Sequence, residues 1–368
     1  MGIERIVVKI GTSTLTNGGR RLNRPRMLEI VQQAAHLYQQ GHEIVFVSSG
    51  AVAAGRERLG FPDFGRSLPA KQMLSAIGQS RLMQMYSELF DIFDLVVAQV
   101  LLTREDIGDR PRFLNARDTL LTLIDRRIIP IINENDTTAT HEIQVGDNDN
   151  LSALVATLIE ADRLIILTDQ DGLYSADPRL HPDAALIERV PKIDDSIFAL
   201  AGGTESGGVG TGGMITKLQA AQLATRSGIT TIVANGRTPT VIERLVAGEA
   251  IGTCFEPVTG QVDSRKRWLM LDKTRGKLHI DDGAVQVLTI GGASLLPVGV
   301  RSVDGDFERG TTLSIIAPNG QEIAHGLTSY HSDDVRRLCG IRSTKIFEIL
   351  GYSYGDAVIH RNNMVLLK

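Results

Sequence analysis

Six continuous apolar runs, rich in β-branched residues, are the feature that most restricts how this chain of 368 residues can fold. The runs are Ile6–Ile10, Ile44–Val47, Leu95–Leu101, Ile128–Ile132, Leu164–Thr168 and Thr231–Val233. A strand with one face in water alternates apolar and polar residues, whereas continuous runs are typical of strands buried on both faces of a mainly parallel sheet. We therefore expect an α/β fold whose ligands bind beyond the carboxyl ends of the strands.

Helical patterns separate these runs. Asn23 and Pro25 precede apolar residues at helical spacing, which is the order of an N-cap and an early proline. Leu151, Leu154, Val155 and Leu158 repeat at i, i+3, i+4 and i+7 directly after the polar run 147–150. The alternation of strands and helices predicts an αβα sandwich with a mainly parallel sheet over residues 1–258.

The pattern changes after Pro257, and the length also favours two domains over one. Residues 259–276 show no clear period, so we interpret them as a linker. From Lys277 onward the chain has short, glycine-punctuated apolar segments that predict a small β-rich domain over 277–368. The expected strands are Leu278–Ile280, Val285–Leu288, Leu295–Val300, Thr312–Ile316 and Glu322–Leu327, with one helix over Asp333–Cys339.

Composition excludes several classes of protein. The hydrophobic fraction of 42% with 22% charged residues is that of a soluble globular protein, and the net charge of -4 argues against a nucleic-acid binder held by bulk charge. Cys254 and Cys339 form no CxxC or metal-ligand spacing, so neither a disulfide scaffold nor a zinc site is expected. With no signal-peptide pattern and no apolar run near the ~20 residues that span a membrane, we expect a cytosolic protein that enters no membrane.

Lys9 lies inside the first apolar run, two residues before the turn at Gly11. An unpaired ammonium in a buried strand is costly. Lys9 is therefore either a strand-end lysine that reaches solvent or a cation beside a glycine turn that admits a phosphate.

A glycine-rich segment precedes a second lysine, Lys217. Gly208, Gly210 and Gly213 match GxGxxG, but no apolar strand precedes them, and threonine rather than glycine stands before Lys217. These two facts exclude the Rossmann and Walker A interpretations. The segment is either a plain flexible loop or a loop that wraps phosphates, with Lys217 supplying a mobile positive charge.

Short polar side chains gather after the fourth run, over 133–136 and 146–150. The spacing Asp-x-Asx is found in calcium loops, but the glycine and distal glutamate of an EF-hand are absent at the required offsets. A capped solvent loop is one explanation. The favoured interpretation is recognition of a zwitterionic amino acid, because carboxylates and amide oxygens accept from its ammonium while N–H groups donate to its carboxylate.

Two further turns follow strand-like runs. Ser49, Gly50 and Ala51 follow the second run with small side chains and free N–H groups, which by themselves indicate a phosphate or carboxylate site only weakly. Thr168 and Asp169 end the fifth run and lead into an Asp/Gly turn.

Taken in order, these segments resemble the amino acid kinase family. The resemblance is carried by 8–13, 49–51, 113–118, 132–136, 145–153, 167–169 and 210–217, and the segments VGDNDNLSA and GTGGM-x-TK are its most specific parts. It covers residues from about 6 to 255, with no departure at a motif position. The C-terminal portion resembles a PUA domain through Ser294–Pro297 and Ile323–Gly326.

Within the family, the resemblance implies ATP-dependent phosphorylation of the side-chain carboxylate of L-glutamate. The products would be γ-glutamyl phosphate and ADP, in the first step of proline biosynthesis, with proline as a feedback inhibitor. Magnesium would accompany ATP, bound chiefly by its phosphates and without a protein ligand that we name. The chain is expected to form a homo-oligomer and to interact with glutamate-5-semialdehyde dehydrogenase (glutamyl phosphate reductase). It is expected to bind neither a membrane nor a nucleic acid.

The resemblance also implies a role for each matching residue. Lys9 and Lys217 would stabilise charge on the transferring phosphoryl group and on the leaving ADP, and Asp149 would organise the two lysines. The expected ATP-binding residues are Lys9, Gly11, Thr168, Asp169, Thr211, Gly212, Gly213, Met214, Ile215, Thr216 and Lys217, with Ile215 contributing mainly through its backbone. The expected substrate-binding residues are Ser49, Gly50, Ala51, Asn133, Asp136, Asp147 and Asn148.

Two rival functions remain open. A different amino acid kinase would act on N-acetylglutamate, aspartate, carbamate or a nucleoside monophosphate, but Asp136 and the run 147–149 favour a free ammonium. An RNA-binding protein would act through the PUA-like domain, yet residues 272–368 contain 11 basic and 11 acidic residues. An RNA-binding domain is usually basic, so we expect RNA binding to be a side activity at most.

Overall fold

A computed structural model describes residues 2–65, 67–139, 147–201, 212–258 and 274–367. The chain divides into two units, Met1–Gln261 and Val262–Lys368. Each unit has hydrophobic core clusters of its own. Among the described residues, no helix combines the length and the apolar character needed to cross a membrane.

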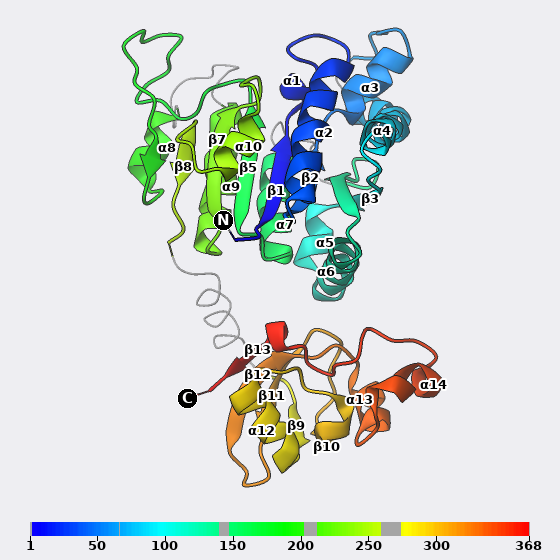
Figure 1. The fold of residues 1–368 in the computed structure, drawn as a ribbon. Helices are drawn as coiled ribbons and strands as arrows, with labels where there is room; N and C mark the ends of the chain where they lie inside the picture. The colour runs from blue at the N-terminus through cyan, green and yellow to red at the C-terminus, as the bar shows by residue number, and fades with distance from the viewer. Residues whose placement is uncertain (1, 66, 140–146, 202–211, 259–273, 368) are drawn as a thin grey trace. The chain divides into compact units, whose positions relative to one another are not determined.

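The first unit is built on a sheet whose described strands run in the order β3-β4-β2-β1-β5-β7-β8-β6 (Figure 1). Their bounds are β1 Arg5–Ile10, β2 Glu43–Ser48, β3 Val97–Leu102, β4 Ile129–Glu134, β5 Arg163–Thr168, β6 Arg189–Val190, β7 Thr230–Asn235 and β8 Thr253–Phe255. All neighbours pair in parallel except β7 and β8, which are antiparallel. The mainly parallel sheet expected from the sequence is confirmed.

Helices cover both faces of this sheet. The described helices are α1 Thr12–Leu15, α2 Arg24–Gln39, α3 Ala51–Arg58, α4 Leu68–Asp91, α5 Arg104–Gly108, α6 Arg110–Asp125, α7 Asp147–Leu158, α8 Asp195–Leu200, α9 Gly212–Arg226 and α10 Val241–Val246. Helices α2, α4 and α10 share one core cluster with the sheet, and α6, α7 and α9 share the other. The result is the predicted αβα sandwich.

The alternation along β1 decides which helices Lys9 can reach. Ile6, Val8 and Ile10 belong to the cluster with α2, whereas Val7 belongs to the cluster with α7 and α9. Successive side chains of a strand point to opposite faces of the sheet, so Lys9 shares the face of Val7. The ammonium of Lys9 is thereby directed toward α7 and α9.

The local signals in the first unit were accurate. Each of the six apolar runs forms a strand, with ends that differ from the prediction by two residues at most. Asn23 caps α2 by accepting a hydrogen bond from the Arg26 N–H at 2.9 Å, as its position before Pro25 predicted. Strands β6 and β8 were not predicted, because they have only two and three residues and therefore leave little pattern in the sequence.

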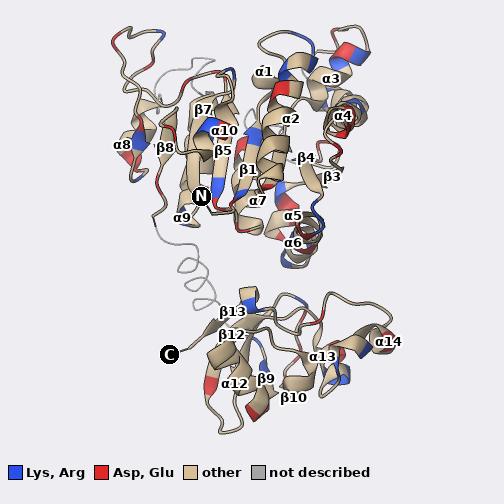
Figure 2. Ribbon diagram, viewed as in Figure 1, with Lys and Arg blue, Asp and Glu red and all other residues tan. Residues whose placement is uncertain are grey.

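The second unit contains a five-stranded sheet in the order β10-β9-β11-β12-β13. The elements are β9 Lys277–Ile280, α12 Asp282–Gly291, β10 Val300–Asp304, β11 Thr312–Ile316, β12 Glu322–Leu327, α13 Ser332–Leu338, α14 Ile346–Leu350 and β13 Met364–Leu366. The strands predicted over Leu278–Ile280, Thr312–Ile316 and Glu322–Leu327 are confirmed, as is the helix predicted over Asp333–Cys339. Both signs of charge occur along its ribbon (Figure 2).

Two predicted strands of this unit are wrong. Val285–Leu288 lies within α12, whose first turn is capped by Asp281 accepting from the Ala284 N–H at 2.8 Å and whose end is closed by Gly292 at φ +56°. Caps at both ends outweigh the β preference of the valines, because strand preference depends on the neighbours that a side chain meets. Leu295–Val300 contains a bridge at Leu295 and a 3₁₀ turn over Pro297–Gly299, and only Val300 enters β10.

Candidate active site

A pocket of about 360 Å³ lies at the carboxyl ends of β1, β2, β4 and β5. The order of these strands reverses at β1, because β2 pairs with one of its edges and β5 with the other. Ligands of open α/β sheets bind at such a switch point. The pocket is lined by Lys9, Gly11, Thr12, Ser13, Ser49, Gly50, Ala51, Val52, Asn133, Glu134, Asp136, Asn148, Asp149, Leu167, Thr168, Asp169, Gly213, Thr216 and Lys217.

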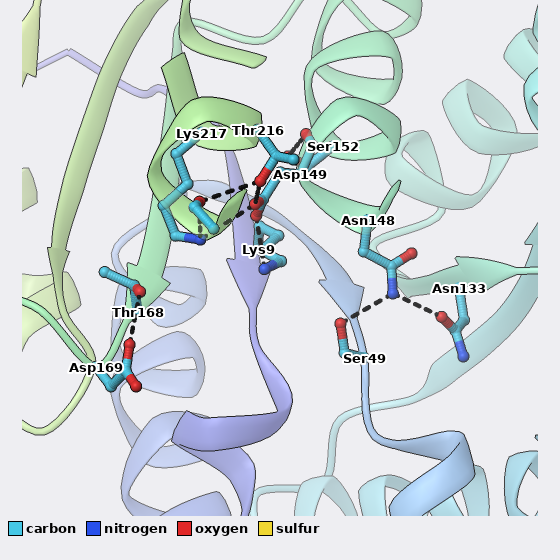
Figure 3. Close-up of polar contacts among 11 residues, drawn as sticks. Lys9, Ser49, Asn133, Asn148, Asp149, Ser152, Thr168, Asp169, Thr216 and Lys217 are labelled. Atoms are coloured by element: carbon cyan, nitrogen blue, oxygen red, sulfur yellow. Dashed lines mark hydrogen bonds and ion pairs between the residues drawn. The ribbon is translucent and has the colours of Figure 1, made fainter. Parts of the chain in front are cut away.

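One part of the pocket, which we call the charged half, consists of Lys9, Asp149 and Lys217 (Figure 3). Lys9 Nζ lies 2.6 Å from Asp149 Oδ1, and Lys217 Nζ lies 3.2 Å from Asp149 Oδ2. Asp149 is fully buried, and Lys9 and Lys217 are 6% and 9% exposed. One carboxylate therefore holds two buried ammonium groups, from β1 and α9, at the start of α7.

Burial and charge act in opposite directions on these groups. Burial alone would raise the pKa of Asp149, but the attraction of Lys9 and Lys217 brings it below its ordinary value of 3.8. Burial lowers the pKa of Lys9 from 10.5 and outweighs the attraction of Asp149, with repulsion from Lys217 adding to the decrease. The carboxylate is thus ionised at neutral pH, and Lys9 releases its proton more readily than an exposed lysine.

Neighbouring groups hold the charged half in place. Thr216 donates to Asp149 Oδ2 at 2.9 Å, and Lys217 Nζ donates to the Gly213 carbonyl at 3.0 Å. Ser152 donates to the Asp149 carbonyl at 2.6 Å. At the end of β5, Thr168 donates to Asp169 Oδ1 at 3.2 Å beside the two lysines (Figure 3). These bonds restrict the side chains before any ligand arrives.

The other part, which we call the amide half, consists of Ser49, Asn133 and Asn148. Asn148 Nδ2 donates to Ser49 Oγ at 2.9 Å and to Asn133 Oδ1 at 3.0 Å (Figure 3). After Ser49 the backbone turns into α3 through Gly50 at φ +107°, where an added Cβ would lie only 2.9 Å from Leu15 Cδ1. Glycine is required at this turn by both conformation and space.

Asp136 lines the pocket beside the amide half. The Ser75 hydroxyl of α4 donates to Asp136 Oδ2, and Gln72 donates to its carbonyl at 3.0 Å. Helix α4 therefore holds the loop after β4, and the carboxylate of Asp136 adds a negative charge to this end of the pocket.

The structure brings fourteen of the predicted site residues to one pocket: Lys9, Gly11, Ser49, Gly50, Ala51, Asn133, Asp136, Asn148, Asp149, Thr168, Asp169, Gly213, Thr216 and Lys217. Met214 and Ile215 instead pack against the core cluster shared with α7. Thr211 lies outside the described residues. Asp147 and Gly212 begin α7 and α9, and the side chain of Asp147 lies outside the described part of the structure.

The segment 113–118 does not reach the pocket. Its Arg117 pairs with Glu160 at 2.6 Å, just beyond the C-terminal end of α7, whereas Asp149 lies at the other end of that helix. A cation near the end of a helix interacts favourably with its dipole, so this motif supports α7.

Sequence reasoning missed the polar face of α4. Ser75 and Gln79 are four residues apart on this helix and bond Asp136 and Asn133, respectively. The signal available in the sequence was weak, because polar residues on a long amphipathic helix are usually solvated. Thr12, Ser13 and Glu134 also line the pocket without having been assigned a role.

Comparisons with known proteins agree with this geometry. The sequence profile of the amino acid kinase family matches residues 4–235, and that of the PUA domain matches residues 276–350. The chain is 56% identical to a glutamate 5-kinase from Herpetosiphon aurantiacus over 98% of both chains. It is 52% identical to a glutamate 5-kinase from Sodalis glossinidius over 99% of both chains.

A solved structure shares the fold of the first unit. The UMP kinase of Bacillus anthracis superposes with a TM-score of 0.50 at 15% identity, over 70% of this chain and 98% of its own. At that identity the similarity concerns the fold alone.

Proposed function

The chain belongs to the amino acid kinase family, and from this premise we propose that it transfers the γ-phosphoryl group of ATP to the side-chain carboxylate of L-glutamate. The products are L-glutamyl 5-phosphate and ADP. The observation that carries the proposal is the pairing of Asp149 with both Lys9 and Lys217 at one end of a pocket whose other end is lined by amides. The full-length similarity to glutamate 5-kinases supports the choice of substrate.

The proposed chemistry needs positioning and charge neutralisation more than proton transfer. A glutamate side-chain carboxylate is ionised at neutral pH, so the nucleophile requires no general base. Negative charge is spread over the phosphoryl oxygens in the transition state and remains on the leaving ADP. Lys9 and Lys217 are the cations placed to stabilise that charge, since both ammonium groups are buried at the pocket.

Asp149 organises the two cations in this scheme. Two ammonium groups that share a carboxylate at 2.6 and 3.2 Å are held in position before ATP binds. The arriving phosphates add negative charge close to Lys9, and this charge favours its protonated form. Thr168, Asp169 and the start of α9, residues 212–217, are the proposed nucleotide contacts on this side.

Magnesium fits the proposed site as a companion of ATP. Asp169 presents a carboxylate to the pocket, and oxygen is the donor that Mg²⁺ prefers. The described residues contain no group of three or more His, Cys, Asp or Glu that could hold a metal ion, so the phosphates of ATP would supply most of its ligands. When bound, the ion neutralises phosphate charge.

The amide half and Asp136 are the proposed binding site for the amino acid. Asp136 is suited to a free α-ammonium group, and the backbone N–H groups near Ser49, Gly50 and Ala51 are suited to the α-carboxylate. The nitrogen of an N-acetylated amino acid is uncharged and cannot form an ion pair with the Asp136 carboxylate. This difference favours glutamate over N-acetylglutamate.

Proline is the proposed inhibitor of this reaction. Proline shares the α-carboxylate and charged nitrogen of glutamate, so we expect it to inhibit in a manner that eases as glutamate rises. Inhibition insensitive to glutamate would indicate a separate site.

The acyl phosphate is labile, and its proposed consumer is glutamyl phosphate reductase in proline biosynthesis. We further propose that the chain acts as a homo-oligomer.

Hydroxylamine trapping tests the reaction and the substrate together. The purified protein is incubated with ATP, Mg²⁺ and hydroxylamine, and hydroxamate formation is measured in parallel with glutamate, N-acetylglutamate and aspartate. Hydroxamate from glutamate alone is the expected result. Hydroxamate from N-acetylglutamate or aspartate in preference to glutamate would overturn the proposal.

A further inference from the structure

A chain of amide hydrogen bonds leads from α4 into the amide half of the pocket. Gln79 Oε1 on α4 accepts from Asn133 Nδ2 at 2.8 Å. Asn133 Oδ1 accepts in turn from Asn148 Nδ2 at 3.0 Å, and the same Nδ2 donates to Ser49 Oγ at 2.9 Å. Asn133, Asn148 and Ser49 line the pocket, whereas Gln79 lines a neighbouring hollow of about 260 Å³.

A backbone N–H group determines which amide groups donate and which accept in this series of hydrogen bonds. Asn133 Oδ1 also accepts from the Glu134 backbone N–H at 2.9 Å. A backbone N–H can only donate, so the oxygen of the Asn133 side chain must lie on that side. The NH₂ end of Asn133 therefore faces Gln79, which has to supply an acceptor, and Asn148 has to present its own NH₂ end to Asn133.

This orientation leaves one acceptor unused by the protein. Asn148 Oδ1 is buried and has no hydrogen-bond partner among the described residues. A buried acceptor without a donor carries a free-energy cost, which a donor on a bound molecule removes. The α-ammonium of an amino acid provides such donors.

We propose that Gln79 is a positioning residue for the amino acid substrate, acting through Asn133 to hold the Asn148 amide in one orientation beside the pocket. This inference rests on the proposed function. Gln79 makes no contact with the reacting atoms in this scheme. Its acceptor oxygen keeps the amide chain in one direction, and the site thereby favours a substrate that carries an ammonium group over the same molecule without it.

Four variants separate this role from packing. Gln79→Met and Gln79→Ala remove the acceptor, whereas Gln79→Glu keeps an acceptor of the same length. Gln84→Met is the matched control, because Gln84 lies on the same helix, is exposed and forms its described side-chain hydrogen bonds with Arg81 and Glu88 of that helix. Each protein is assayed by hydroxamate formation with glutamate and with glutarate, which is glutamate without the amino group. Thermal unfolding shows whether each variant is folded.

Gln79→Met and Gln79→Ala are expected to raise KM for glutamate about five- to tenfold, the effect of losing one hydrogen bond. The kcat and the KM for ATP should change little. The preference for glutamate over glutarate, measured as the ratio of kcat/KM, should fall by a similar factor. Gln79→Glu and Gln84→Met should resemble the unaltered protein in all these quantities.

Three results would overturn the inference: an unchanged glutamate KM in both acceptor-less variants, an equal loss in Gln79→Glu, or a parallel change in kcat and in KM for ATP. The last two would assign Gln79 to packing alone. Failure of the proposed function would give a different result. In that case even the unaltered protein would form no hydroxamate from glutamate.

Discussion

The charged half and the amide half of the pocket are built from different interactions. In the charged half, two lysines meet one buried carboxylate at ion-pair distances. In the amide half, neutral side chains bond one another at 2.9 and 3.0 Å. Charge is placed where a phosphoryl transfer redistributes charge, and directional neutral bonds are placed where a substrate must be oriented. The contrast predicts that substitutions in the first half change kcat and those in the second change KM.

Lys217→Met should have the largest effect. If Lys217 stabilises charge that grows in the transition state, kcat should fall on the order of 10²–10³-fold while KM for glutamate stays nearly constant. Steady-state kinetics on the folded variant measure both quantities. The control is Lys192→Met, which removes an exposed lysine outside the pocket. A change confined to KM would break the contrast between the halves.

Asp136→Ala should act in the opposite way. The charge of the substrate ammonium is the same before and during phosphoryl transfer, so Asp136 contributes equally to both states. We expect KM for glutamate to rise about 10- to 100-fold, corresponding to ~1.5–3 kcal/mol for a hydrogen bond to a charged group, with a much smaller change in kcat. Asp183→Ala, at an exposed position, is the comparison. A loss confined to kcat would contradict this assignment.

The pH profile tests the charged half without a substitution. Lys9 must be protonated to stabilise phosphate charge, and burial lowers its pKa from 10.5. The kcat/KM for ATP, which reports groups of the free enzyme, should therefore fall as pH rises through a midpoint below 10.5, by about tenfold per pH unit beyond it. Because the Asp149 pKa lies below 3.8, that carboxylate should not titrate between pH 5 and 10. Direct measurement of ADP formation gives the profile, and a flat profile up to pH 10.5 would refute the role of Lys9.

Removal of the second unit should have the smallest effect. The pocket residues all lie between Lys9 and Lys217, and the first unit has hydrophobic cores of its own. We propose residues 1–258 as the catalytic domain, 259–276 as a linker and 277–368 as a PUA-like domain with a role in regulation or assembly. A chain ending at Gly260 should fold and keep kcat within about twofold, because every residue that lines the pocket belongs to the first unit. A folded but inactive shortened chain would show that catalysis depends on the second unit.

Local sequence signals predicted the first unit better than the second. Strands buried on both faces of a parallel sheet leave continuous apolar runs, and α2 carries both its cap and its early proline. At Val285–Leu288 a short apolar run led to the wrong prediction of a strand, because valines in a short segment are compatible with either a strand or a helix. The capping by Asp281 and Gly292 decided for the helix.

The sequence predicted which residue types form the site, because it places lysines near glycine turns and clusters Asn and Asp side chains after a strand. The family resemblance implied that Asp149 organises Lys9 and Lys217, whereas the other contacts among these side chains were decided by the tertiary structure. Lys217 lies 68 positions after Asp149, and Asn133 lies 54 positions after Gln79. Contacts over such separations depend on strand order, on the face of β1 that carries Lys9 and on the packing of α4, α7 and α9. No local pattern encodes these three, because each is settled only when distant elements bury their apolar faces against one another.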